Sequence, residues 1–289
     1  VWQMIFSIMR VNMTMKNKLS VYGSTGFIGS SFCKMFDCDS VERNTRTPNT
    51  DEVLYLISTT HNYNVLEDSF IDIDTNLSTL LETLDACRKK GINTFNFISS
   101  WFVYGDTELP ATETSNCNPK GFYSITKRCA EQLLISYCET FKIDYRILRL
   151  CNVYGGTDKS ATKKKNALQY LIDEMKINNK ISLYDAGNFY RNYMHLSDVC
   201  RAINLVCKKG DKNQIYNIGS INNYLFSDII ELAIKELDYN LDIMTMEIPD
   251  FHKIVQVKDI LIDTKKLQML GFSEKVSIEN GIKELCKTS

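Results

Sequence analysis

The sequence lacks an excess of positive or negative charge. Its 34 lysines and arginines nearly match its 35 aspartates and glutamates, so the formal net charge is −1. Binding dominated by phosphate contacts requires a clustered excess of cations, which argues against nucleic acid as the main partner. The basic run Lys163–Lys165 predicts a solvated loop.

Long apolar runs are also missing. The apolar segment Val1–Met9 is too short to span a bilayer. The positive charges that begin at Arg10 follow this segment, whereas a signal peptide carries them first. We therefore expect neither a membrane nor an export role. We interpret residues 1–17 as an extension, with the natural start near Met13 or Met15.

The ten cysteines include no C-x-x-C pair, a spacing typical of zinc and redox sites. Most of them, such as Cys129 and Cys138, fall in apolar patterns. This predicts reduced packing residues in a cytoplasmic protein, and no metal site. No internal repeat or low-complexity linker is visible. With 289 residues, 44% of them hydrophobic, the chain can bury one large α/β unit and a smaller lobe.

A strand that runs directly into a glycine turn is the first positive feature. Leu19–Tyr22 is typical of a short buried strand, and glycines 23, 26 and 29 precede a helical stretch to about Phe36. In a dinucleotide-binding turn, Gly23 would permit the tight turn and Gly26 would let the backbone approach a pyrophosphate. Gly29 would allow the helix to pack closely on the strand. Glycines also mark ordinary turns, so the position after a strand carries this prediction.

The pair Tyr123 and Lys127 is the second feature. Positions i and i+4 share a helix face, so the Lys127 ammonium can lie beside the Tyr123 phenol. An adjacent positive charge lowers a phenol pKa toward the range of a general acid or base. The alternative is a solvated pair on an exposed helix face, which is the more common occurrence of this spacing.

Strand and helix patterns alternate along the chain, which predicts an α/β fold with a doubly wound parallel sheet of the Rossmann type. Ligands bind such sheets at the carboxyl ends of the strands. After the glycine turn and its helix, the predicted elements are the strand Val53–Ser58, the helix Thr75–Arg88, the strand Thr94–Ser99, the helix of Tyr123 and the strand Tyr145–Leu150.

The stretch between Phe36 and Val53 is too short for a full strand-helix-strand passage. The best candidate for a second strand is Val41–Asn44, whose end carries Glu42 and Arg43. A carboxylate there would bond the ribose hydroxyls of NAD, whereas a guanidinium would favour the 2′-phosphate of NADP. The segment carries both a carboxylate and a guanidinium, and because of Arg43 we slightly favour NADP.

Further segments follow in order along the chain. They are Ser99–Gly105 (SSWFVYG), Tyr123 with Lys127, Arg149–Gly155 (RLCNVYG), Arg191–Val199 (RNYMHLSDV), Tyr216–Ser220 (YNIGS), Asp263–Leu267 and Leu270–Phe272. With the glycine turn, this ordered set resembles the extended short-chain dehydrogenase/reductases, the NAD(P)-dependent nucleotide-sugar epimerase and dehydratase family. The resemblance runs from about Lys18 to the C-terminus.

The resemblance implies a catalytic triad of Ser100, Tyr123 and Lys127. Ser100 would hold a sugar oxygen, Tyr123 would transfer its proton, and Lys127 would anchor the nicotinamide ribose and lower the phenol pKa. Without Tyr123, the two serines at 99 and 100 would be interpreted as ordinary strand-end turn residues.

The resemblance also implies the remaining contacts. Arg191 suits a sugar phosphate because a guanidinium binds phosphate oxygens in bidentate fashion. His195 matches a family position inside a strand, and we interpret it as a packed structural residue. The expected substrate contacts are Ser99, Ser100, Asn152 and Arg191, and the expected cofactor contacts are Gly23, Thr25, Gly26, Phe27, Ile28, Gly29, Arg43, Ser58 and Lys127.

Departures from the family narrow the expected reaction. The 4,6-dehydratases carry an acidic pair directly after the triad hydroxyl, where this chain has Trp101 and Phe102, so dehydration is disfavoured. The GDP-fucose synthase type places a cysteine at the Phe102 position. The resemblance then implies hydride transfer at C4 of a nucleotide-diphosphate hexose with NAD or NADP, as a 4-epimerase or a 4-keto reductase. The alternative is a non-catalytic dinucleotide-binding sensor or scaffold, although such proteins usually lose the tyrosine or the lysine.

The resemblance implies two parts and a homodimer. The NAD(P)-binding domain would comprise 18–155 with about 188–219, and the substrate lobe 156–187 with 220–289. Many relatives pair through two long helices, here Thr75–Arg88 and the helix of Tyr123. The outward faces of these helices include Ile135 and Tyr137.

Overall fold

The computed structural model describes residues 18–156, 158, 161–162, 165–178, 180–238 and 241–287. The predicted extension 1–17 and most of the basic run 163–165 lie outside the described residues. At the centre is a six-stranded sheet in the order β10-β5-β4-β3-β1-β2, in which every neighbouring pair is parallel. Its strands are β1 (Ser20–Tyr22), β2 (Asp39–Ser40), β3 (Glu52–Tyr55), β4 (Thr94–Ser100), β5 (Asp144–Leu150) and β10 (Gln214–Ile218).

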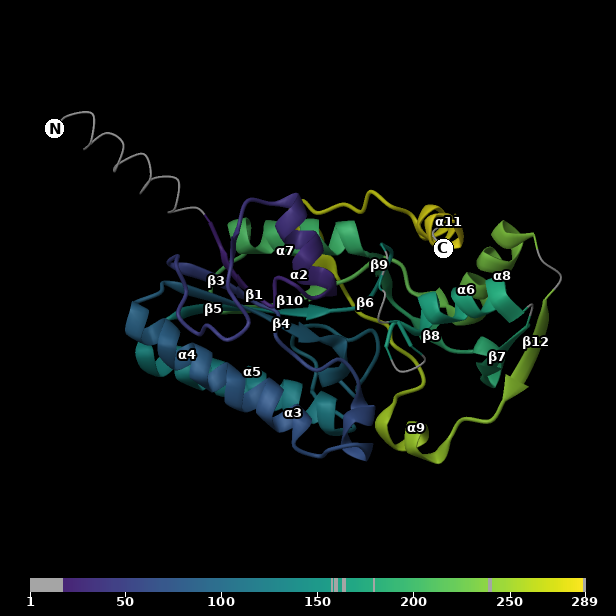
Figure 1. Ribbon diagram of the computed structural model, residues 1–289, viewed down its shortest axis with the longest axis horizontal. Helices are drawn as coiled ribbons and strands as arrows, with labels where there is room; N and C mark the ends of the chain where they lie inside the picture. Colours follow the sequence, from purple (N-terminus) through teal and green to yellow (C-terminus); the bar gives the residue numbers. More distant parts are fainter. Residues whose placement is uncertain are drawn as a thin grey trace.

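Helices cover both faces of this sheet (Figure 1). On one face, α2 (Phe27–Met35) and α7 (Leu196–Lys209) pack on a core that includes Leu148. On the other face, α4 (Thr79–Lys90) and α5 (Phe122–Phe141) enclose a second core. Because both faces are covered, β4 is buried along its whole length. The predicted doubly wound α/β fold is confirmed.

The second strand lies earlier than the sequence pattern predicts. β2 occupies Asp39–Ser40 and pairs with β1, so the prediction of a strand over Val41–Asn44 is wrong. The N–H of Val41 still donates to the Val21 carbonyl at 3.1 Å, but the chain then turns away from the sheet. Arg43 is therefore an exposed turn residue and does not end a strand. Between β2 and β3 the described residues form no helix, in agreement with the short passage predicted.

The helix before β4 begins earlier than predicted. It starts as α3 (Ile71–Ile73), passes through one π turn, η2 (Asp74–Ser78), and continues as α4. Gly91 ends it in the left-handed conformation, with φ +78°. The π turn carries Asn76, which is buried. Such turns are rare and frequently mark functional sites.

A smaller lobe lies beside the sheet (Figure 1). The helices α6, α8 and α11 pack around a core of their own that includes Ile172, Ile230 and Ile282. The elements of this lobe and its connections are β6 (Asn152–Tyr154), α6 (Ala167–Asn178), β7 (Lys180–Tyr184), η4 (Asp185–Gly187), β8 (Tyr190–Arg191), β9 (Tyr193–His195), β11 (Tyr224–Leu225), α8 (Phe226–Leu237), β12 (Asp242–Met246), α9 (Asp250–Val255), α10 (Lys265–Met269) and α11 (Ile278–Lys287). Two short 3-10 turns, η1 (Asn62–Leu66) and η3 (Trp101–Val103), follow β3 and β4.

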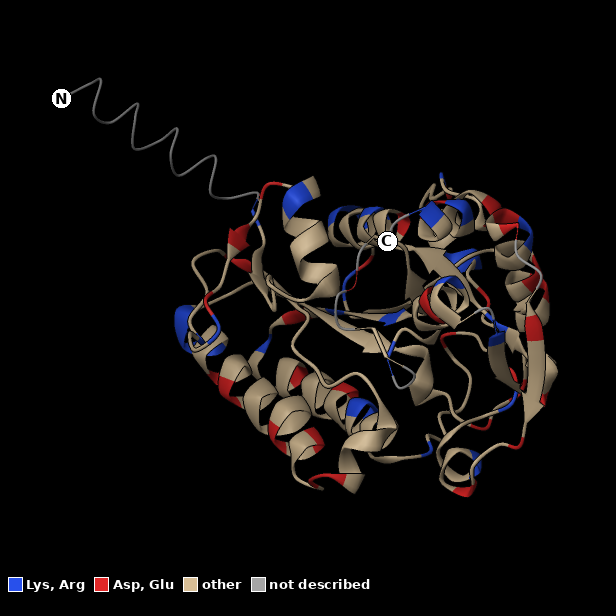
Figure 2. Cartoon of the chain, turned by 45° about the vertical axis from the view of Figure 1, so that its right-hand side comes forward, with Lys and Arg blue, Asp and Glu red and all other residues tan. Residues whose placement is uncertain are grey.

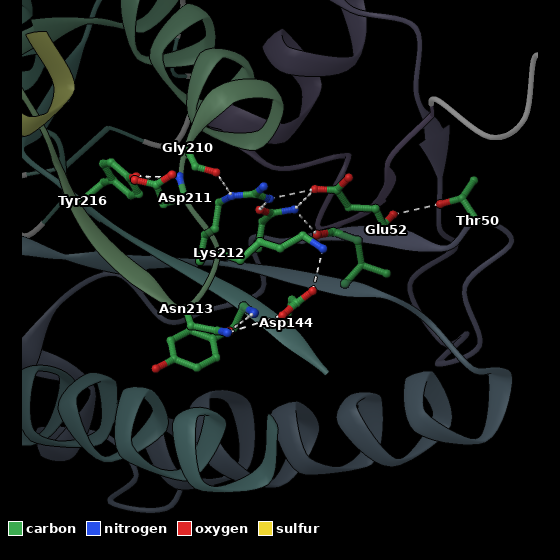
Figure 3. Close-up of polar contacts among 12 residues, drawn as sticks. Thr50, Glu52, Asp144, Gly210, Asp211, Lys212, Asn213 and Tyr216 are labelled. Carbon is green, nitrogen blue, oxygen red and sulfur yellow. Dashed lines mark hydrogen bonds and ion pairs between the residues drawn. The ribbon is translucent and has the colours of Figure 1, made fainter. Parts of the chain in front are cut away.

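The amino edge of the sheet is closed by its own polar contacts (Figure 3). Arg146, near the start of β5, donates to the Gly210 carbonyl at 2.8 Å and to the Glu52 carboxylate at 3.1 Å. Lys212 pairs with Asp144 at 2.5 Å. Because these groups satisfy one another, this edge stabilises the fold, and ligands are expected at the opposite, carboxyl edge.

In the cartoon of Figure 2, basic and acidic segments are interspersed over both parts of the chain. This distribution agrees with the formal net charge of −1. Among the helices of the described ranges, none combines the length and the apolar character that crossing a membrane requires.

Candidate active site

The glycine turn joins β1 to α2 at the carboxyl edge of the sheet. Gly23 has φ +79°, in the left-handed region that favours glycine, and its carbonyl accepts the N–H of Gly26 at 3.0 Å. A Cβ on Gly29 would lie 2.2 Å from the same carbonyl oxygen, so glycine is required for α2 to approach this closely. No side chain caps the first turn of α2, an arrangement that suits an anion at the helix N-terminus.

The other predicted cofactor contacts take different positions. Thr25 is exposed at the tip of the turn, whereas Phe27 and Ile28 are partly buried against the core. Arg43 is exposed in the turn after β2. Ser58 donates to the side-chain oxygen of Asn76 at 3.0 Å, so its hydroxyl already has an intramolecular partner.

Gly29→Ala is expected to weaken dinucleotide binding, because the methyl group would meet backbone atoms of the turn at 2.2 and 2.9 Å. The turn would have to move, at a cost in stability on the order of 1–3 kcal/mol. Titration with NADH and NADPH by nicotinamide fluorescence, together with thermal unfolding, measures both effects.

Gly91→Ala is the matched control for that change. Gly91 also has positive φ, but a Cβ there meets nothing within 4 Å, and it caps α4 just before β4 begins, at the amino edge of the sheet. Its replacement should cost stability without changing dinucleotide affinity. Equal affinities for Gly29→Ala and the unaltered protein would contradict the assignment of the turn.

Tyr123 is buried in the first turn of α5. It is 7% exposed, and its ring stands edge-on to the Phe102 ring with centroids 5.6 Å apart. Burial raises the pKa of Tyr123 to about 12, and the charge of Asp72 adds to this effect. Hydrogen bonding to the Ser100 hydroxyl acts in the opposite direction. The structure therefore brings Ser100 to the phenol, as predicted.

The phenol and the glycine turn meet at the segment after β3. Gly23 packs against the Leu56–Ile57 peptide, where an added Cβ would lie 3.2 Å from the Leu56 backbone. Ser58, the next residue, reaches Tyr123. A phosphate-binding turn and a buried phenol are thus neighbours at one edge of the sheet.

Lys127 shares the helix face of Tyr123, but its ammonium is directed to a backbone carbonyl. Its ammonium donates to the Ile98 carbonyl at 2.7 Å and lies 4.1 Å from the centroid of the Phe97 ring. Burial lowers the pKa of Lys127 to about 7, which Glu131 partly opposes. The expected lowering of the phenol pKa by Lys127 is therefore wrong for this structure, because burial dominates at Tyr123 and the ammonium is directed to a carbonyl.

A buried ion pair lies one turn further along α5. Glu131 accepts two hydrogen bonds from Arg149, at 3.0 Å from Nε and 2.8 Å from Nη2, and both side chains are at most 1% exposed. Burial alone would raise the pKa of Glu131, but Arg149, with help from Ser99, holds it below its ordinary value. Ser99 lies near this pair, and its predicted substrate contact stays a prediction. The spacing of Tyr123, Lys127 and Glu131 on one face is the signal that could have revealed this pair.

Further polar residues that the sequence analysis missed lie beside Tyr123. Asn76 is 2% exposed and donates to the Thr126 hydroxyl at 2.9 Å, which ties the π turn to α5. Asp72, 1% exposed, lies one turn earlier on α3. Asn76 could have been found because it falls in line with the buried leucines 80 and 84 on the helix pattern. Nothing in the sequence pattern indicated Asp72.

The predicted substrate contacts Asn152 and Arg191 lie where the smaller lobe joins the sheet. Asn152 donates from Nδ2 to the Asn192 carbonyl at 3.0 Å. Arg191 donates from Nη1 to the carbonyls of Tyr190 and Lys258. Burial lowers its pKa to about 10. Both side chains therefore take part in holding the lobe, and a phosphate contact at Arg191 stays a prediction.

His195 caps α7. Its Nδ1 accepts the N–H of Ser197 at 3.3 Å, and its ring fills the space where a Cβ on Gly155 would lie 2.2 Å away. Its Nε2 lies 3.5 Å from a carboxylate oxygen of Glu284, a partner from α11 that the local sequence did not reveal. These contacts agree with the structural interpretation.

The smaller lobe is fastened across the carboxyl edge. Asn62 of η1 is fully buried and donates to the Val255 carbonyl of α9 at 3.2 Å. The Tyr63 hydroxyl lies 2.7 Å from Nδ1 of His252. A small hollow nearby, between the segment that begins at Trp101 and the segment Val257–Ile262, includes neither Ser100 nor Tyr123 in its lining.

Comparison with protein families gives a match over residues 33–219 to the NAD dependent epimerase/dehydratase family. The matched region begins after the glycine turn and includes Tyr123 and Lys127.

Relatives of known sequence carry names of more than one reaction type. A provisionally named UDP-glucose 4-epimerase of Methanocaldococcus jannaschii is 29% identical over 224 residues, which cover 77% of this chain and 71% of that protein. A dTDP-D-glucose 4,6-dehydratase of Mus musculus is 30% identical over 209 residues, covering 70% and 57%. In a trifunctional dehydratase, epimerase and reductase of Arabidopsis thaliana, 27% identical over 245 residues, the match covers 82% of this chain and 35% of that protein.

Solved structures share the fold. The UDP-glucuronic acid 4-epimerase from Bacillus cereus, in complex with UDP-glucuronic acid and NAD, has a TM-score of 0.82 at 21% identity and covers 92% of this chain and 97% of its own. RMD from Pseudomonas aeruginosa, complexed with NADPH, has a TM-score of 0.79 at 21% identity, with coverage of 93% and 97%. Similarity to epimerases and dehydratases alike does not separate the reactions.

Proposed function

We propose that this chain, which belongs to the NAD dependent epimerase/dehydratase family, catalyses hydride transfer at C4 of a nucleotide-diphosphate hexose. The cofactor is NAD or NADP. One observation carries the proposal. The buried phenol of Tyr123 lies with the Ser100 hydroxyl beside the segment that contacts the glycine turn. This places a proton-transfer group next to a dinucleotide-binding turn.

The glycine turn fits a dinucleotide, because the close approach of Gly29 to the Gly23 carbonyl leaves no room for a side chain. Gly23, Gly26 and Gly29 would hold the pyrophosphate. The nicotinamide ring, when bound, supplies or accepts the hydride. Arg43 is exposed beyond β2, and we propose that it contacts the 2′-phosphate of NADP.

Ser100 and Tyr123 handle the sugar oxygen in this proposal. Ser100 holds the oxygen by a hydrogen bond, and Tyr123 donates a proton to it or removes one. Because the pKa of Tyr123 is raised to about 12, the phenol carries its proton at neutral pH. A protonated phenol suits donation to a ketone oxygen, so reduction of a 4-keto hexose is the first candidate. The 4-epimerase relative supports 4-epimerisation as the second.

Two aromatic residues argue against dehydration. The rings of Trp101 and Phe102, directly after Ser100, stack with centroids 3.8 Å apart. Neither offers the acid or base that elimination of water requires. Dehydratases do occur among the relatives, so this part of the proposal rests on these two side chains. Formation of a 4-keto-6-deoxy sugar from UDP-glucose or dTDP-glucose would overturn it.

The test of the function begins with the absorbance spectrum of purified, desalted protein, followed by titration with NADH and NADPH. Nicotinamide retained through purification supports a 4-epimerase, which must keep its cofactor between two hydride transfers, and directs the assay to UDP-hexoses. Reversible binding of NADPH by an empty protein supports a 4-keto reductase, to be assayed with nucleotide-linked 4-keto-6-deoxyhexoses. Binding of neither would contradict the proposal.

We propose that two copies pair through α4 and α5. The outer surfaces of these helices expose Leu81, Ile125 and Phe141, each at least 38% accessible. Burying such side chains between copies would favour association. Tyr137, predicted to face outward, also donates to Asp85 at 3.3 Å within the chain. A monomeric mass by light scattering at micromolar concentration would contradict this pairing.

A further inference from the structure

Asp72 is a buried carboxylate that the proposed chemistry does not use. It lies on α3 and is 1% exposed. One of its oxygens accepts from the Thr59 hydroxyl and from the side-chain amide of Asn64, the latter at 3.0 Å. An aspartate is seldom buried without a compensating set of donors, so its position here calls for an explanation.

The directions of the hydrogen bonds around Asp72 are set by the backbone N–H of Thr59, which can only donate. The backbone N–H of Thr59 donates to Oδ1 of Asn76 at 3.0 Å, so that oxygen is an acceptor and the amide orientation is set. The Asn76 nitrogen must then donate to the Thr59 hydroxyl, at 2.8 Å. The Thr59 hydroxyl has one hydrogen, which it gives to Asp72.

The same argument applies to Ser58. Its hydroxyl donates its single hydrogen to Oδ1 of Asn76 at 3.0 Å. Toward Tyr123 it can then offer only a lone pair, so the phenol donates in that contact and Ser58, unlike Ser100, does not stabilise the phenolate. We call Ser58, Thr59, Asn76 and Asp72 the Asp72 network. All of its hydrogen bonds are consistent with a protonated Tyr123, and at the far end the Asp72 carboxylate accepts the Thr59 hydrogen.

The charge of Asp72 also favours the protonated form of Tyr123. A nearby negative charge disfavours phenolate, and Asp72 raises the pKa of Tyr123 beyond the effect of burial. Besides burial, Asp72 is the group that raises the pKa of this phenol. The other titratable groups near the site are Lys127, Arg128 and Glu131 on α5, and Tyr63, Asp74 and Arg149 on elements packed against it.

We propose that Asp72 is a positioning residue that, through the Asp72 network, presents the phenol of Tyr123 to the substrate as a proton donor. The proposal rests on the proposed function in one respect, the assignment of Tyr123 as the acid. It goes beyond that function by naming the group that sets the direction of proton transfer, and it favours reduction over oxidation in the first step.

A purely structural role for Asp72 gives a different expectation. In that case the carboxylate only ties Thr59 and Asn64 to α3, and its loss lowers stability without changing the titration of Tyr123. The two roles are therefore separated by the protonation of the phenol, which can be followed without cofactor or substrate.

The test is Asp72→Asn in protein labelled with ¹³C at Cζ of tyrosine. The Tyr123 resonance is assigned by its loss in Tyr123→Phe, and its chemical shift is followed with rising pH over the range in which circular dichroism shows an intact fold. We expect the onset of phenolate formation to fall by about one pH unit. In active protein, the alkaline limb of the pH dependence of kcat should move by the same amount, with little change in KM.

Asp74→Asn is the matched control, because it removes the same charge two residues away at an exposed position. Thr59→Val is the second variant if Asp72→Asn does not fold, since it breaks the network between Asn76 and Asp72, and it should move the onset in the same direction. Titration curves of the folded variant that superimpose on those of the unaltered protein would overturn the proposal, as would an equal change for Asp74→Asn. Because the titration needs no turnover, failure of the proposed function would show separately, as absence of activity in the unaltered protein.

Discussion

Tyr123→Phe is expected to lower turnover by a factor of about 10²–10⁴, the usual contribution of one positioned acid or base. The change removes only the hydroxyl, so the buried ring keeps its edge-on contact with Phe102. Binding of the dinucleotide at the glycine turn should be unaffected, because the turn contacts the Leu56–Ile57 peptide and not the phenol. Steady-state kinetics and fluorescence titration of the same preparation measure the two quantities.

Tyr55→Phe is the matched control for this experiment. Tyr55 lies in β3, is fully buried, and has a pKa that burial raises, as at Tyr123. Its phenol belongs to the core beneath α4 and α5, and it is not among the hydroxyls that bond to Tyr123. Loss of this hydroxyl should leave turnover unchanged. Full turnover by Tyr123→Phe would contradict the catalytic assignment and favour a dinucleotide-binding sensor or scaffold.

Glu131→Ala is expected to lower the free energy of unfolding by about 3–5 kcal/mol, because it leaves the guanidinium of Arg149 buried without its charge partner. The pair is inaccessible on both sides, and its two hydrogen bonds are short at 3.0 and 2.8 Å. Arg149 also lies 4.7 Å from the centroid of the Tyr104 ring, which cannot neutralise its charge. Urea unfolding followed by circular dichroism gives the magnitude.

A double variant separates the ion pair from simple loss of packing. Glu131→Leu with Arg149→Met removes both charges while keeping apolar volume, so its cost should be well below the sum of the two single changes. Additive costs would show that the destabilisation does not arise from the pair. Glu131 also partly opposes the fall in the Lys127 pKa, so the single variant should lower that pKa further.

The glycine turn could be predicted from sequence because its requirements are local. Positive φ at Gly23 and close packing at Gly29 involve atoms within a few residues of each other. Helical spacing likewise placed Tyr123 and Lys127 correctly on one face. The destination of the Lys127 ammonium was not predictable, because the Ile98 carbonyl that receives it belongs to a strand 29 residues earlier.

The sequence by itself determined the order of strands and helices, the dinucleotide turn and the candidate phenol, because backbone preference and periodicity are properties of short segments. Only the tertiary structure decided the environment of that phenol. Burial raises the pKa of Tyr123, and Asp72 acts on it from α3, which precedes β4 along the chain but packs against α5 in space. The tertiary structure also decided the position of Arg43. Pairing with β1 ends shortly after β2, so Arg43 lies in the turn that follows. Burial and charge depend on which distant segments pack together, and no local pattern encodes that.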